Sequence, residues 1–112
     1  MTLAGFLKLH RKLKRWAWYK DQNTKAVFLD LLIEANYEDK NWNGILIKRG
    51  QLVTSLLTLS KDLGLSIRNV RTALDHLKKT GEIEELATTR YRLVTICNYD
   101  IYQAKECEIE DE

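Results

Sequence analysis

The stretch that decides the fold is residues 65–83, LSIRNVRTALDHLKKTGEI. Ser66 is a favoured N-cap residue and Gly81 is a stop signal, so the pattern predicts a helix over residues 66–80. At roughly 100° per residue, four apolar side chains fall within about 80° of one another. They are Ile67, Val70, Leu74 and Leu77. The helix should therefore pack through one stripe and expose a polar face.

That polar face carries side chains suited to DNA. Arginine can form paired hydrogen bonds with guanine and asparagine with adenine, while the other groups can reach phosphates or thymine methyl groups. The predicted DNA contacts on this helix are Arg68, Asn69, Arg71, Thr72, His76 and Lys79. The alternative is an ordinary solvent-exposed face, and for His76 in particular a plain polar role facing water.

A second helix is predicted just before this one, across a tight turn. From Ser55 the apolar spacing becomes helical, Gly64 ends the helix, and Ser66 caps the next. Residues 82–96, EIEELATTRYRLVTI, follow as two strands around a polar turn at residues 88–90, which predicts a β-hairpin.

The hairpin offers two arginines, Arg90 and Arg92, for phosphate or minor-groove contact. Thr88 and Thr89 lie beside them in the predicted turn. An ordinary hairpin turn is an equally weighted alternative. Three glutamates at the base of the hairpin would repel phosphates, so only the tip and the return strand suit DNA. They are Glu82, Glu84 and Glu85.

The N-terminal half predicts one clear helix. An N-cap at Asp21 or Asn23 and apolar side chains at helical spacing predict a helix over residues 23–35. Residues 36–44 are interpreted as a polar loop. Residues 45–55, ILIKRGQLVTS, are interpreted as two short extended segments around a turn, one of which pairs with later strands.

The order helix, strand, helix, turn, helix, hairpin is that of a winged helix-turn-helix. The predicted fold class is therefore α+β, mainly α, with a small antiparallel β-hairpin as the wing. In such a fold the second of the turn-linked helices enters the major groove, and the wing contacts the DNA backbone or the minor groove.

Residues 1–20 form a basic-aromatic segment that suits either a short helix or an extended arm. Its basic side chains are Lys8, His10, Arg11, Lys12, Lys14 and Arg15. Three roles compete: phosphate contact, packing on the domain or on a second subunit, and contact with a membrane surface. Packing is favoured. The side chains predicted to pack or to join subunits are Phe6, Leu7, Trp16, Trp18 and Tyr19.

The chain has 112 residues, which suits a single domain, predicted over residues 1–105 and followed by an acidic, disordered tail at residues 106–112. The formal net charge is +2, from 18 basic and 16 acidic residues. Five of the acids lie in the tail, so residues 1–105 hold 18 basic against 11 acidic residues, about +7. A basic body suits a polyanion partner, with a tail that competes for the same surface, although solubility alone would also explain the charge.

The sequence contains no pattern that indicates catalysis or metal binding. Cys97 and Cys107 form no Cys-x-x-Cys pair, the two histidines are far apart, and neither a Gly-rich phosphate loop nor a Ser/His/Asp order occurs. We therefore expect no catalysis, cofactor, metal site or disulfide. Without a long apolar run or a signal-peptide pattern, a reduced, cytoplasmic protein is expected.

Three motifs carry a resemblance to a known family. They are IKRGQLVTS at 47–55, VRTAL at 70–74 with TGEI at 80–83, and ICNYDIYQ at 96–103. Over residues 5 to about 103 the chain resembles the N-terminal winged-helix domain of phage replisome organiser proteins, relatives of the bacterial DnaD primosome family. The resemblance implies origin binding in replication initiation. The partners it implies are double-stranded DNA, further copies in a dimer or higher oligomer, and replication proteins such as a helicase loader.

The family's full architecture adds a second helical domain, so the sequence matches its first domain only, either as a piece of a longer protein or as a stand-alone domain. Two alternative functions stay open. A winged-helix transcriptional regulator would use the same fold and contacts, and only the resemblance favours replication. The second alternative is a protein-protein or oligomerisation module of the primosome with weak DNA binding. The acidic tail and the glutamates at the base of the hairpin favour it.

Overall fold

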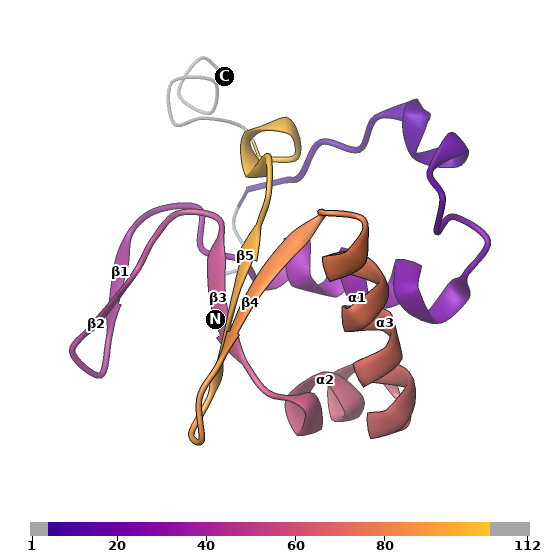
Figure 1. Ribbon diagram of the computed structural model, residues 1–112. Coiled ribbons are helices and arrows are strands. Elements are labelled where there is room, and N and C mark those ends of the chain that lie inside the picture. Colours follow the sequence, from indigo (N-terminus) through magenta and orange to yellow (C-terminus); the bar gives the residue numbers. More distant parts are fainter. Residues whose placement is uncertain (1–4, 104–112) are drawn as a thin grey trace, which may run out of the picture.

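The computed structural model describes residues 5–103, which form three α-helices and two antiparallel sheets (Figure 1). The helices are α1 (Gln22–Glu34), α2 (Leu56–Leu63) and α3 (Ile67–Lys79). Two short 3-10 helices, η1 (Arg11–Arg15) and η2 (Tyr99–Ile101), lie near the ends of the described chain. The α+β class is confirmed. The predicted acidic tail, residues 106–112, lies outside the described residues.

Five strands complete the described fold. β1 (Lys40–Trp42) and β2 (Ile45–Ile47) form a two-stranded hairpin. β3 (Gln51–Thr54), β4 (Ile83–Ala87) and β5 (Arg92–Ile96) form a three-stranded sheet in the order β3-β5-β4. β4 and β5 are the predicted hairpin, and β3 is the earlier extended segment that pairs with a later strand, as expected.

Side-chain and glycine caps define the ends of the helices. The Asp21 carboxylate accepts from the Thr24 amide, so Asp21 rather than Asn23 caps α1. The Ser66 hydroxyl accepts from the Asn69 amide at 3.1 Å and starts α3. Gly64 ends α2 in the left-handed region at φ 68°, a conformation that costs glycine little. The predicted boundaries at Gly64 and Ser66 are confirmed.

The core lies between α1, α3 and the inner face of the three-stranded sheet. Its fully buried side chains include Phe28 and Leu31 from α1, Val70 and Leu77 from α3, and Val94 from β5. Burying side chains of this size stabilises the fold by about 1.5–3 kcal/mol each.

One residue of the predicted apolar stripe departs from it. Ile67 is 41% exposed, because it occupies the first turn of α3 beyond the edge of the core, and Ala73 is buried instead.

The predicted polar loop at residues 36–44 is wrong in part, because it contains β1. Asn43 and Gly44 both have positive φ, 48° and 79°, and connect β1 to β2 in the conformation that tight β-hairpins favour. Trp42 then packs edge-on against Tyr91, at 5.2 Å between ring centroids. The β1–β2 hairpin therefore packs against the turn of the β4–β5 hairpin.

The N-terminal segment packs on the domain. Leu7 forms a β-bridge with Gln103, and Trp16 contacts Phe28 at 5.1 Å between ring centroids. The indole nitrogens of Trp16 and Trp18 donate to Glu82 and Thr80, just beyond the end of α3.

Two members of the predicted packing set, Tyr19 and Phe6, are not part of the hydrophobic core. Lys25 lies over the ring of Tyr19, 4.1 Å from its centroid. Phe6 is 52% exposed and remains the member of that set most open to a second subunit.

Candidate nucleic-acid interface

The predicted DNA-binding face starts at the N-terminal end of α3. Residues 64–66 turn the chain from α2 into α3, and the Ser60 carbonyl accepts from the amides of both Gly64 and Leu65. In Figure 1, the first turn of α3 and the turn between β4 and β5 lie at the same end of the molecule, at the bottom of the view. One flat partner could therefore meet both.

Four of the predicted side chains gather on this end of the helix. Arg68, Asn69, Arg71 and Thr72 are all exposed and occupy its first two turns. The first turn contains no acidic residue, and the positive end of the helix dipole adds to the attraction for phosphate. Lys79 is exposed as well, but it lies about 16 Å further along the helix axis. The structure thus brings four of the predicted contacts together and leaves Lys79 apart.

His76 faces water only in part, because its side chain is 30% exposed and its ring is engaged within the fold. Its ring stacks on Trp18 with centroids 4.3 Å apart and planes within 4°. Its Nδ1 lies 2.9 Å from the Thr24 hydroxyl and 3.3 Å from the Asp21 carboxylate. The side chain therefore joins the start of α1 and the N-terminal segment to α3, rather than reaching outward toward DNA.

Arg92 is also engaged within the fold. Its guanidinium lies 2.8 Å from the carboxylate of Glu85, which the Lys78 ammonium contacts at 2.9 Å. The Glu85 side chain is only 4% exposed. Burial alone would raise the pKa of Glu85, but hydrogen bonds from Lys78 and Arg92 outweigh burial and hold that pKa below its usual value. Arg92 thus balances a buried charge at the base of the β4–β5 hairpin.

We predict that Glu85→Gln destabilises the protein by about 1–2 kcal/mol at neutral pH, because Lys78 and Arg92 lose their shared counter-charge and both are partly solvated. The folded-state pKa lies below the unfolded one, so this contribution is present above the unfolded pKa and is lost as pH falls through the folded pKa. Denaturant unfolding at neutral and at acidic pH measures the difference.

The matched control for that substitution is Glu84→Gln, at an exposed neighbour on β4. It should change little at either pH. If Glu85→Gln cost the same at both pH values, the ion pairs would not be its cause.

The tip of the second hairpin keeps one exposed arginine. Thr88 shapes the turn, because its hydroxyl donates to the Tyr91 carbonyl and accepts from the amides of Arg90 and Tyr91. Thr89 and Arg90 lie exposed at the tip. Of the two predicted wing arginines, Arg90 is therefore the exposed one at the tip, whereas Arg92 is paired with Glu85.

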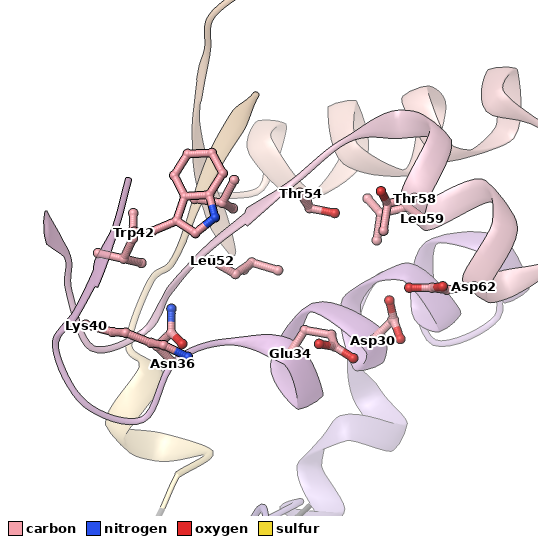
Figure 2. A pocket seen from close by; sticks show the side chains of 12 residues that line it. Asp30, Glu34, Asn36, Lys40, Trp42, Leu52, Thr54, Thr58, Leu59 and Asp62 are labelled. Atoms are coloured by element: carbon pink, nitrogen blue, oxygen red, sulfur yellow. The ribbon is translucent and has the colours of Figure 1, made fainter. Parts of the chain in front are cut away.

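A cavity of about 220 Å³ opens between α1, α2 and the first hairpin (Figure 2). The carboxylates of Asp30, Glu34 and Asp62 line one part of it, and Trp42 lines another. Burial, and then the charges of Glu34 and Asp62, raise the pKa of Asp30. Sequence reasoning missed this cavity. Its acidity makes this surface unsuited to phosphate.

The acidic residues of this cavity do not form a metal site. Between residues 5 and 103, no group of three or more His, Cys, Asp or Glu side chains is arranged to hold a metal ion. The second oxygen of Asp30, Oδ2, is buried and has no hydrogen-bond partner among those residues.

Comparison of the chain with protein-family models, with curated proteins and with solved structures finds no match. Fold and site therefore define the class: a small α+β domain whose third helix and second hairpin present exposed polar and basic side chains at one end. None of the helices between residues 5 and 103 has both the length and the apolar composition needed to cross a membrane.

Proposed function

We propose that the protein is a winged helix-turn-helix protein that binds double-stranded DNA, with α3 in the major groove and the β4–β5 hairpin as its wing. One observation carries the proposal: the start of α3 and the tip of the hairpin, both of which carry exposed residues, lie at the same end of the molecule (Figure 1). The short turn between α2 and α3 is consistent with the same fold.

In this proposal each exposed group has a defined role. Arg68 and Arg71 form paired hydrogen bonds with guanines, and Asn69 does so with an adenine. Thr72 contacts a phosphate or a thymine methyl group, and Arg90 neutralises a phosphate beside the wing. Binding is non-covalent and needs no cofactor.

The biological role we propose is phage-type DNA replication initiation, as in the replisome organiser proteins that the chain resembles. Two of the resembling motifs meet in the fold. The Arg49 guanidinium lies 2.9 Å from the Asp100 carboxylate and 5.1 Å from the centre of the Tyr99 ring. Residues of two of the motifs that carry the resemblance therefore contact each other in the fold.

The same resemblance supports the remaining parts of the proposal: a homo-oligomer that contacts other replication proteins in the cytoplasm. A transcriptional regulator with this fold is the main alternative. Gene neighbourhood separates the two, because a neighbouring helicase-loader gene favours replication, whereas a divergent promoter favours repression.

The interaction-module alternative loses part of its support. It rested partly on three glutamates at the base of the β4–β5 hairpin. Glu82 accepts hydrogen bonds from Trp16 and Thr80, and Glu85 is paired with Lys78 and Arg92. Glu84 is the exposed member of the three. Of the three charges expected to repel DNA, only that of Glu85 is therefore balanced by cations within the fold.

Titrating a labelled DNA duplex at several salt concentrations tests the proposal. If about four to six phosphates are neutralised, the logarithm of the affinity should fall against the logarithm of salt concentration with a slope of roughly −4 to −5. Fluorescence anisotropy provides the affinities. A flat response, or no binding at low salt, would reject DNA binding in favour of an interaction module.

A further inference from the structure

The two 3-10 helices η1 and η2 lie at the opposite end of the molecule from the first turn of α3 (Figure 1). A groove with mixed chemistry is lined by residues of both helices and their flanks. Its volume is about 370 Å³. Its apolar lining is Leu9, Leu13, Trp16, Ile101 and Tyr102, and its basic lining is His10, Lys12 and Arg15. DNA offers phosphates but little aliphatic surface, so this combination fits an acidic peptide with an apolar side chain better than it fits DNA.

The groove is held in shape from both sides. Trp16 is fixed by its hydrogen bond to Glu82 at 2.7 Å and by its contact with Phe28. On the other side, the Lys8 amide donates to the Tyr102 carbonyl at 2.6 Å. Because both walls are tied to the core, a ligand would not have to order them, which lowers the cost of binding.

The groove also has unused binding capacity. Leu9 is 55% exposed and Ile101 is 48% exposed. Lys12 and Arg15 are exposed, and within residues 5–103 neither forms an ion pair. Arg11 and Lys14 share that property, so η1 is a basic segment with no counter-charge in the described part of the chain.

A complementary segment follows directly in the sequence. Residues 106–112, ECEIEDE, contain five acids, with Ile109 among them. Gln103, next to the lining residue Tyr102, is six positions before Ile109, a span of up to about 20 Å. Because the bridge between Leu7 and Gln103 is antiparallel, the chain at Gln103 runs opposite to the chain that leads from Leu7 into η1. Reaching the groove therefore needs a turn, for which two central residues suffice.

We propose that the groove between η1 and η2 binds the acidic segment at residues 106–110 of the same chain. Ile109 occupies the apolar lining, and Glu106, Glu108 and Glu110 pair with Lys12 and Arg15. A short connection gives the segment an effective concentration in the millimolar range, which makes a weak site effective. The acids then neutralise η1 rather than the face of α3, contrary to the expectation that the tail competes for the DNA surface.

The test needs no DNA and is independent of the proposed function. A nitroxide spin label on Cys107, in the full chain carrying Cys97→Ser, broadens the NMR signals of nearby amides. The proposal predicts that the amides of Leu9, Leu13 and Ile101 lose most of their intensity, while those of Arg68 to Thr72 keep theirs. High salt should restore the lost intensity, because the charges are exposed.

Paired variants of the labelled chain control the result. Lys12→Glu with Arg15→Glu should abolish the broadening, and so should Ile109→Ser, which changes no described residue. Lys20→Glu with Lys61→Glu makes the same change in charge at exposed positions outside the groove lining and should leave the broadening intact.

Three outcomes would overturn the proposal. Strongest broadening on α3 would place the segment on the DNA-binding face. If no set of amide signals were selectively broadened, the acidic segment would be a solvated end of the chain. The third outcome concerns a mixture of spin-labelled chains with chains that carry no spin label. If the groove signals broadened only between different chains and not within one chain, the groove would bind the tail of a second copy.

Discussion

Replacing Arg68 and Arg71 together with alanine should lower the affinity for the preferred DNA site by roughly 30-fold or more, since each paired hydrogen bond to a guanine contributes about 1–3 kcal/mol of discrimination. The affinity for unrelated DNA should fall much less, because contacts with phosphate remain. Both side chains are exposed and lie off the core, so the unfolding transition should not move. The double variant is thus expected to fold normally and to lose its preference among sequences.

The measurement compares two duplexes, one selected by the protein from a random pool and one scrambled. Lys20→Ala is the control, because Lys20 is an exposed cation at the end of the N-terminal segment rather than in the first turn of α3. It should leave the ratio of the two affinities unchanged. If the double variant also kept that ratio, α3 would not be the element that reads the sequence.

The largest expected effect on stability comes from Gly50→Ala. Gly50 is buried with φ at 84°, a backbone conformation that costs residues with a Cβ about 1–2 kcal/mol. An added Cβ would also lie 2.9 Å from the Cβ of Tyr99. The backbone cannot easily move away, because the Gly50 amide donates to Asn36 and its carbonyl accepts from Ile96. We expect a total loss of about 2–5 kcal/mol once the overpacking is added.

Gly44→Ala separates the two contributions. Gly44 has a similar φ of 79°, but nothing lies within 4 Å of the added Cβ. Its replacement should therefore cost only the backbone term, about 1–2 kcal/mol. Chemical denaturation of both variants gives the comparison. Equal losses would show that the contact between Gly50 and Tyr99 is not a constraint on the fold.

Local chemistry explains why much of the helical part could be predicted from sequence. Ser66 caps α3 with its own side chain, and Gly64 ends α2 through its own backbone freedom, so each signal acts within a few residues of where it is read. The pairing of β4 with β5 is similarly local, since the chain turns back on itself through residues 88–90.

The first hairpin was predictable in principle but was missed. Asn43-Gly44 is among the strongest short signals for a tight hairpin, and Ile45 to Ile47 supply one apolar strand. The partner strand, Lys40 to Trp42, carries a lysine and an asparagine, which are depleted in strands and indicate a loop instead. The turn chemistry prevailed over the composition of the strand.

The errors in the candidate site have a different cause, because they depend on partners distant in the sequence. The His76 ring contacts the hydroxyl of Thr24, 52 positions away in the sequence, and stacks on the ring of Trp18. Helical periodicity places a side chain on a face but does not reveal what covers that face. The acidic cavity was missed for the same reason: Asp62 of α2 joins Asp30 and Glu34 of α1 only in the folded chain.

The most direct test of the central claim, that the start of α3 and the tip of the second hairpin meet DNA, is NMR mapping of the full chain during titration with a DNA duplex. The predicted result is that the largest amide shifts occur at residues 66–72 and 88–90, with little change at Asp30, Glu34 and Asp62 around the acidic cavity. Shifts centred on η1 or on the first hairpin, with the start of α3 unchanged, would contradict the claim.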